Sequence, residues 1–253
     1  MELTLKILVL DIENSYLLTG NWGIWNQTMG IDQILDGGKV LCYAAKWLGE
    51  REIIFCRHDE THFLLLMHAL LDEADAVITF NGKRHDLPLL NREFIKAGMG
   101  PPSPYKHIDL FETAKKHFKF PSNKLDYLLR ELGLGKKVEH EGFPLWIKVL
   151  KDDEKAWKLM ERYNIADVRL TEKLYNKFRG WIVNHPNHNL FNPNGFVCTN
   201  CGSRRLQRRG YYHTQTQTYQ RYHCQKCGAW SRDRLTSIPA DKRRSILTGT
   251  SNV

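Results

Sequence analysis

The alternation of apolar and polar positions predicts a chain in which strands and helices follow one another. Apolar runs of strand length occupy residues 3–11, 40–49, 52–57, 76–82 and 105–110. Apolar residues at helical spacing occupy residues 61–74, 86–98, 111–120, 123–135 and 152–178, the last long enough for one helix or two. Several strands come first, and later strands alternate with helices. This order predicts an α/β fold with a mixed sheet and helices packed on it.

Composition places the chain among ordinary folded proteins. Its 253 residues suffice for one full domain and a smaller module, and 42% of them are hydrophobic against 26% charged. No apolar stretch approaches the roughly 20 residues that span a bilayer. The first residues form a charged strand and not a secretory signal. We therefore expect a cytoplasmic protein with no membrane partner.

The net charge of +9 is confined to the C-terminal part of the chain. From Gly180 onward there are eleven Lys and Arg residues against two Asp, whereas the residues before it hold 26 basic and 26 acidic side chains. An Arg-rich module on a neutral body is typical of proteins that bind nucleic acid. A solvated charged surface is the alternative.

A stretch rich in Pro, Asn and Gly at residues 185–195 marks the boundary between body and module. We expect a first domain at residues 1–182, a linker at 183–195 and a small cysteine-containing module at 196–236. Residues 237–253 are polar and lack a periodic pattern, so we expect a flexible tail there.

Two carboxylates stand close together at the end of the first predicted strand. Asp11 and Glu13, in the run LKILVLDIEN, point to the same face because residues two apart in a strand do so. Like charges at this spacing repel unless a cation lies between them, and hard divalent cations prefer such oxygen ligands. The pair therefore predicts a metal site.

Two further acidic residues and a tyrosine extend this pattern. Asp86 enters a helix after a short strand in ITFNGKRHDLPLL, and Tyr163 lies four residues before Asp167 in ERYNIADVRL. In this order the motifs resemble the tyrosine subtype of the DEDD 3′–5′ exonucleases, whose fold is ribonuclease H-like. The resemblance covers roughly residues 4–180. The segment around Asp86 is especially similar to family B polymerase proofreading domains.

The resemblance implies hydrolysis of phosphodiester bonds with two Mg²⁺ or Mn²⁺ ions. It implies that Asp11 bridges both ions and that Asp86 holds one of them. Glu13 and Asp167 would complete the site on the nucleophile side. Tyr163 would orient the attacking water, since an ordinary phenol pKa of about 10 makes it a poor base. Taken singly, these acids also fit a polar strand end, a helix cap or a helix surface.

Other residues near these motifs are candidates for substrate binding. Asn81 could contact the substrate strand, although its turn chemistry explains it equally well. Trp22 and Trp25 could stack on terminal bases or pack in the core. Asn14 and His85 stand where many relatives carry Thr and an aromatic residue, so they could alter the fit of the substrate.

Four of the six cysteines form a second metal motif. Cys198-x-x-Cys201 and Cys224-x-x-Cys227 are each followed by Gly and are separated by 22 residues. Two such turns supply the tetrahedral thiolate set of a Zn²⁺ site, and four protein ligands leave no position for substrate. We therefore expect one structural Zn²⁺, since a cytosolic context disfavours disulfides.

The segment between the two cysteine pairs resembles zinc ribbons and is rich in Arg and Tyr. Its arginines can contact phosphates, and its tyrosines can stack or pack. The candidate nucleic-acid contacts are Arg204, Arg205, Arg208, Arg209 and Arg221. The alternative is a surface that docks a replication or recombination protein.

Taken together, the motifs predict a metal-dependent 3′–5′ exonuclease that acts on single-stranded or frayed ends. The combination is similar to small stand-alone exonucleases of bacteriophage genomes, which implies the cytoplasm of a prokaryote or of a phage-infected host. DNA is the expected substrate, and RNA stays open because no residue is seen to recognise the 2′-hydroxyl. The alternatives are an inactive binding or adaptor protein on the same fold and a structure-specific endonuclease.

Overall fold

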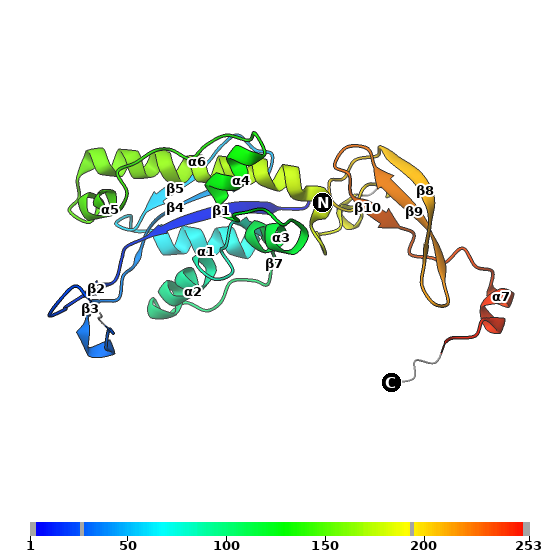
Figure 1. The fold of residues 1–253 in the computed structure, drawn as a ribbon, viewed down its shortest axis with the longest axis horizontal. Coiled ribbons are helices and arrows are strands. Elements are labelled where there is room, and N and C mark those ends of the chain that lie inside the picture. The colour runs from blue at the N-terminus through cyan, green and yellow to red at the C-terminus, as the bar shows by residue number, and fades with distance from the viewer. Residues whose placement is uncertain (1–3, 26–27, 193–194, 250–253) are drawn as a thin grey trace. The chain divides into compact units, whose positions relative to one another are not determined.

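The computed structural model describes residues 4–25, 28–192 and 195–249 (Figure 1). The chain divides into two compact units. One is Lys6–Tyr175, and the other contains the described residues from Asn176 onward.

The first unit is built on a five-stranded mixed sheet with the order β5-β4-β1-β6-β7. Its strands are β1 (Ile7–Asn14), β4 (Val40–Trp47), β5 (Ile54–Arg57), β6 (Ala76–Thr79) and β7 (Lys106–Asp109). The central strand β1 is antiparallel to β4 and parallel to β6. At the edges, β5 is antiparallel to β4 and β7 is parallel to β6. The predicted mixed sheet is confirmed.

Helices cover both faces of this sheet. They are α1 (Phe63–Glu73), α2 (Asp86–Lys96), α3 (Leu110–His117), α4 (Leu125–Glu131), α5 (Phe143–Val149) and α6 (Glu154–Phe178). Figure 1 shows α1 and α2 on one side of the sheet and α6 on the other. Of the two possibilities for residues 152–178, the structure has one helix of 25 residues.

Two apolar clusters hold the sheet to its helices and separate the two sides of β1. Leu8, Leu10 and Ile12 pack in one cluster with the buried side chains of α1 and α2. On the other side, a second cluster joins β4 to α5 and α6 and includes Trp157 and Met160. Because strand residues alternate, Asp11 and Glu13 face away from the first cluster and toward α6.

A small extension follows β1 before the chain returns to the sheet. It contains β2 (Leu18–Thr19), the 3₁₀ turn η1 (Ile31–Gln33) and β3 (Ile34–Asp36), and β2 pairs with β3 in a two-stranded sheet. Several large apolar side chains on this extension are exposed, among them Trp22, Ile24, Trp25, Ile31 and Leu35. The extension therefore adds little to the core.

The second unit contains a three-stranded antiparallel sheet with the order β10-β9-β8. Its strands are β8 (Leu206–His213), β9 (Thr218–Cys224) and β10 (Trp230–Arg232), preceded by the 3₁₀ turns η2 (Arg179–Trp181) and η3 (His188–Phe191). The segment expected to be a tail contains a short helix, α7 (Ala240–Ser245). No helix in the part of the chain that the structure describes is both long and apolar enough to cross a membrane.

Candidate active site

Three of the four predicted carboxylates converge between β1 and α6. One carboxylate oxygen from each of Asp11, Glu13 and Asp167 lies within 4.8 Å of the others. The side chain of Asp167 is almost fully buried, with 2% exposed. The strand period brings the first two side chains to one face, and α6 crosses that face with Asp167.

Asp86 lies beside this cluster without being one of its three members. It is the first residue of α2, is buried, and accepts a hydrogen bond from the backbone N of Ile12 through Oδ1 at 3.2 Å. Because Ile12 lies between Asp11 and Glu13, this bond fixes the stretch of β1 that carries both. The negative charge of Asp86 also raises the pKa of Asp11, although burial and the charge of Asp167 contribute more.

Burial makes it costly to keep all four acids ionised. It raises the pKa of Asp11 well above the ordinary value, and the neighbouring carboxylates raise it further. Burial, followed by the charge of Asp167, raises the pKa of Glu13 to about 8. Burial raises the pKa of Asp86 to about 6 and also raises that of Asp167. The site therefore retains protons near neutral pH unless cations replace them.

Asn164 is a buried partner of Asp11 that the motifs did not reveal. Its Nδ2 donates to Asp11 Oδ2 at 2.7 Å and to the backbone oxygen of Asp11 at 3.2 Å, and its side chain is fully buried. The available signal was its position three residues before Asp167, which places both on the same face of α6. Asn164 thus orients Asp11 from the helix that also supplies Asp167.

Lys137 brings a positive charge into the cluster from the loop between α4 and α5. Its Nζ lies 2.5 Å from Asp167 Oδ2 and donates to the phenol oxygen of Tyr163 at 2.8 Å. Burial lowers the pKa of Lys137, but the charge of Asp167 and the contacts with Asp167 and Tyr163 outweigh burial and raise it overall. Lys137 is therefore a cation, and it offsets one of the four acidic charges.

Tyr163 sits beside this ion pair with its ring largely enclosed. The rings of His140 and Trp146 meet it edge-on, with centroids 4.9 and 6.4 Å away. Burial raises the pKa of the phenol above its ordinary value, and the charge of Asp167 raises it further. The hydroxyl is therefore protonated at neutral pH, held by Lys137, and suited to hydrogen bonding rather than to proton abstraction.

The donor set fits divalent metal ions. Asp167 Oδ1 is buried and has no hydrogen-bond partner among the described residues, and the remaining ligands are carboxylate oxygens. Mg²⁺ and Mn²⁺ prefer such hard oxygen ligands. Since Lys137 offsets only one acidic charge, added cations would relieve the repulsion among the others. Asp11, Glu13 and Asp167 could hold metal directly, with Asp86 next to them.

A cleft of about 420 Å³ opens at this cluster. Asp11 and Lys137 line it together with Asn81, Phe80, Phe111, Asn123, Lys124 and Leu125. Asn81 adopts a φ of 65° at the turn after β6, and its backbone N donates to Asp109 Oδ1 at 2.9 Å. Asp109 also accepts from Phe111 N and caps α3, so it is a structural acid outside the metal cluster. The cleft is open to a substrate that would reach Asp11.

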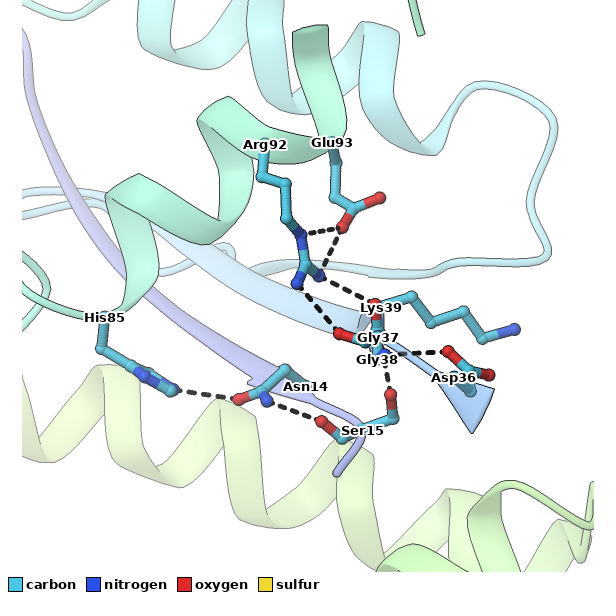
Figure 2. Close-up of polar contacts among 9 residues, drawn as sticks. All are labelled: Asn14, Ser15, Asp36, Gly37, Gly38, Lys39, His85, Arg92 and Glu93. Carbon is cyan, nitrogen blue, oxygen red and sulfur yellow. Dashed lines mark hydrogen bonds and ion pairs between the residues drawn. The ribbon is translucent and has the colours of Figure 1, made fainter. Parts of the chain in front are cut away.

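A polar network connects Asn14 and His85, the two residues that stand where many relatives carry Thr and an aromatic residue (Figure 2). His85 Nε2 and Asn14 Oδ1 lie 2.9 Å apart, so the residue after Glu13 contacts the residue before Asp86. Asn14 Nδ2 donates to the backbone oxygen of Ser15 at 2.7 Å, and Ser15 Oγ accepts from Lys39 N at 2.8 Å. The pair therefore links the ends of β1 and α2 next to the carboxylates.

An arginine of α2 holds the return from the extension into β4. Arg92 donates to the backbone oxygens of Gly37 and Gly38 at 3.1 and 2.9 Å, and its guanidinium group pairs with Glu93 at 2.6 Å (Figure 2).

The two tryptophans of the extension lie at the surface. Trp22 is fully exposed and Trp25 is 83% exposed, so neither packs in the core. Neither lines the cleft at Asp11. Their stacking on bases stays a prediction.

The four predicted zinc ligands converge in the second unit. The Sγ atoms of Cys198 and Cys227 lie 3.6 Å apart, as do those of Cys201 and Cys224, and all four fall within 4.8 Å. Four Zn–S bonds of about 2.3 Å in a tetrahedron require sulfur atoms about 3.8 Å apart. None of the six cysteines forms a disulfide. This arrangement fits a structural Zn²⁺.

The glycine after each second cysteine has a conformational role. Gly202 and Gly228 have φ angles of 66° and 75°, a left-handed conformation that side chains disfavour.

The candidate nucleic-acid residues lie on or next to the strands of the second unit. Arg204 and Arg205 precede β8, Arg208 and Arg209 lie on it, and Arg221 lies on β9. The first four are exposed and Arg221 is partly exposed.

Comparisons with known proteins identify the class. The profile of the RNase_H superfamily matches residues 44–179, which is more than half of the chain. The chain belongs to the RNase_H superfamily. The matched segment includes Asp86, Tyr163 and Asp167 and begins after Asp11 and Glu13. A search of curated proteins found no match.

Among solved structures, the fold is similar to the family B DNA polymerase from the hyperthermophilic archaeon Pyrobaculum calidifontis. The TM-score is 0.53 at 18% sequence identity, over 69% of this chain and 24% of the polymerase chain. The chain thus corresponds to about a quarter of that polymerase. At this identity the likeness establishes the fold alone.

Proposed function

We propose that the protein is a metal-dependent 3′–5′ exonuclease that hydrolyses phosphodiester bonds at single-stranded or frayed ends, with DNA as its substrate. The observation that carries the proposal is the convergence of Asp11, Glu13 and Asp167, with Asp86 beside them, in a ribonuclease H-like fold. Asp11 of this cluster also lines a cleft. The similarity to a family B DNA polymerase supports a role on DNA. The motif order in the sequence supports the exonuclease subtype.

Each residue of the cluster has a role in this proposal. Asp11, Glu13 and Asp167 would hold two Mg²⁺ or Mn²⁺ ions, and Asp86 would support the second ion while holding β1 through Ile12. When bound, these ions would supply stabilisation of the negative charge that develops on the phosphate. The four acidic side chains would also help to position a water molecule and the scissile bond in the cleft.

Tyr163 and Lys137 would position the attacking water. The protonated phenol has a fixed place one helical turn before Asp167, because Lys137 donates to its oxygen. It can accept or donate a hydrogen bond to water without a change of charge. Lys137 pairs with Asp167 in the same contact, so we describe it as a positioning residue.

The four-cysteine module, residues 196–236, would aid nucleic-acid binding. This module carries eight of the eleven Lys and Arg residues found from Gly180 onward against one Asp, and its arginines are exposed or partly exposed. Docking of a replication or recombination protein is the competing role for this module. The further competing functions for the whole chain are an inactive adaptor and a structure-specific endonuclease.

The test is cleavage of single-stranded DNA labelled at either end, with Mg²⁺ or Mn²⁺. We expect stepwise shortening from the 3′ end and loss of activity in Asp11→Ala. Glu161→Ala is the matched control, since Glu161 lies on α6 but is exposed. Absence of cleavage with either metal would leave the adaptor function, and discrete internal cuts would favour the endonuclease.

A further inference from the structure

We infer that one face of the β8–β10 sheet is a stacking platform for single-stranded nucleic acid. This inference rests on the proposed function and names the surface that would hold the strand. It assigns the contact to six residues: Tyr212, Tyr219, Arg221, His223, Trp230 and Arg232. The sequence alone indicated a phosphate contact for Arg221 and left the tyrosines open between stacking and packing.

Strand register places these residues on one face. Tyr212 pairs with Tyr219 across β8 and β9, Trp230 pairs with His223 across β10 and β9, and Arg232 pairs with Arg221. Directly paired residues lie on the same side of a sheet, and residues two apart in a strand share a side. The positions 219, 221 and 223 on β9 therefore join the three pairs into a continuous face.

On this face, arginine side chains lie over aromatic rings. The guanidinium carbon of Arg232 is 4.0 Å from the ring centroid of Tyr219 and 5.4 Å from that of Tyr212. The guanidinium carbon of Arg221 is 4.7 Å from the centroid of Trp230. The rings of His223 and Trp230 have centroids 4.6 Å apart. Flat groups thus follow one another along the sheet.

These groups are accessible. Trp230 is 52% exposed and Tyr212 is 46% exposed, although exposed aromatic rings cost free energy in water. A guanidinium group above a ring keeps its N–H donors in its own plane, where they can bind phosphate. The bonds described for these two arginines are to the backbone oxygens of Arg209 and Asp233, which leaves further donors on each.

The opposite face of the same sheet serves the module's small core. Tyr222 is buried, its ring meets that of Phe196 edge-on at 4.9 Å, and its hydroxyl donates to Asp233 at 3.2 Å. Cys224, also on this side of β9, belongs to the four-cysteine cluster. Tyr222 and Cys224 on this face thus have partners within the module, whereas Trp230 and Tyr212 leave ring surface open on the other face.

Charge and ring geometry together select the occupant. The chain from Gly180 onward carries eleven basic residues against two acidic ones, which favours a polyanion. Aromatic rings gain by stacking on bases, which only an unpaired strand presents, whereas a duplex presents mainly its phosphates. We therefore assign the face to single-stranded DNA or RNA and not to a duplex.

The experiment uses the full-length, zinc-containing chain with Asp11→Ala, so that binding is measured without cleavage. The probes are fluorescent single strands of DNA and of RNA and a blunt DNA duplex of equal length, titrated by anisotropy at several salt concentrations. Trp230→Ala and Tyr219→Ala remove rings from the platform. Tyr211→Ala is the matched control, since Tyr211 is 51% exposed and pairs with Gln220 on the opposite face.

We expect each platform variant to weaken single-strand binding about 5- to 50-fold and Tyr211→Ala to change it less than about twofold. Trp230→Phe should restore most of the affinity. Arg232→Gln should reduce the magnitude of the salt slope by about 0.7. Lys158→Gln, at an exposed position of α6 in the first unit, should leave the slope nearly unchanged. Zinc content equal to that of the parent chain shows that each variant is folded.

Equal losses in the platform and control variants would overturn the inference, as would unchanged single-strand affinity in Trp230→Ala. If the platform variants weaken duplex binding as much as single-strand binding, the assignment to an unpaired strand is wrong. A surface that binds protein predicts no dependence of nucleic-acid affinity on either ring. Cleavage by the chain with Asp11 intact is scored separately, so failure of the nuclease proposal is distinguishable from failure of the platform.

Discussion

The two units of this chain place their charged side chains in opposite environments. In the first, the carboxylates of Asp86 and Asp167 are 4% and 2% exposed and crowd against Asp11 and Glu13. In the second, arginines lie at the surface and above aromatic rings. Buried like charges are strained without a cation at contact distance, whereas exposed charges attract a polyanion over a range set by salt. Catalysis and strand binding should therefore be separable by mutation.

The largest expected separation of cleavage from strand binding comes from Asp167→Asn. The substitution removes a carboxylate from the metal cluster and also the partner of Lys137. We expect cleavage to fall by at least about 100-fold, the scale for loss of one electrostatic catalytic group. Affinity for a single strand should change less than about threefold. Single-turnover cleavage and anisotropy on the same preparation measure both, and a parallel loss would mean that the two units do not act independently.

The converse separation comes from Cys224→Ser. Loss of one thiolate should release Zn²⁺ and unfold the four-cysteine module, because the binding free energy of structural zinc is folding free energy. Limited proteolysis should then cut within residues 196–236 while Lys6–Tyr175 stays resistant. We expect weaker binding with retained cleavage at saturating DNA. Loss of the protected first unit as well would contradict its independence.

A smaller effect should appear in stability as a function of pH. Burial raises the pKa of Glu13 to about 8 and that of Asp86 to about 6, so between about pH 4 and pH 8 the folded chain binds more protons than the unfolded chain. Stability is therefore highest below the unfolded pKa values and falls as pH rises through the folded ones. Without Mg²⁺, we expect the melting temperature to drop by about 5 °C or more from pH 5 to pH 8.

Glu13→Gln tests the cause of that pH dependence. It removes one buried charge, so the variant should melt at a higher temperature than the parent at pH 8 without Mg²⁺ and should show a shallower pH dependence. Added Mg²⁺ should stabilise the parent more than the variant. Thermal melting followed by circular dichroism gives the melting temperatures of parent and variant, each with and without Mg²⁺, across the pH range. A parent whose stability rises with pH would show that the carboxylates are not strained.

The smallest effect is expected at the exposed extension. Trp22→Ala should change the free energy of unfolding by less than about 0.5 kcal/mol, because Trp22 is fully exposed. Trp157→Ala is the buried counterpart, 2% exposed, and should cost about 3–5 kcal/mol. Chemical denaturation measures both. If Trp22→Ala also leaves substrate affinity unchanged, the stacking role predicted for Trp22 is wrong.

Local patterns predicted those features that depend on residues near one another in sequence. The two-residue period of β1 predicted that Asp11 and Glu13 share a face, and the helical pattern of residues 152–178 predicted the region that carries Asp167. The two Cys-x-x-Cys turns predicted a four-cysteine cluster. For the strand face, the helix and each single Cys-x-x-Cys turn, the geometry is set within a few residues by backbone sterics and hydrogen bonds.

Contacts between distant segments were not predictable in this way. Lys137 lies in a loop without a periodic pattern, and nothing local indicates that it reaches Asp167 and Tyr163. The contact between His85 and Asn14 depends on the packing of α2 against β1. Whether Trp22 was buried depended on the path of the extension.

By itself, the sequence determined the order of strands and helices, the acidic motifs, the cysteine pairs and the location of the positive charge. Only the tertiary structure decided that Asn164 and Lys137 complete the acidic cluster and that Arg221 and Arg232 share a face with Trp230 and Tyr219. The physical reason is that helix and strand periods direct side chains locally. Strand register and the packing of helices on the sheet decide which of those side chains meet.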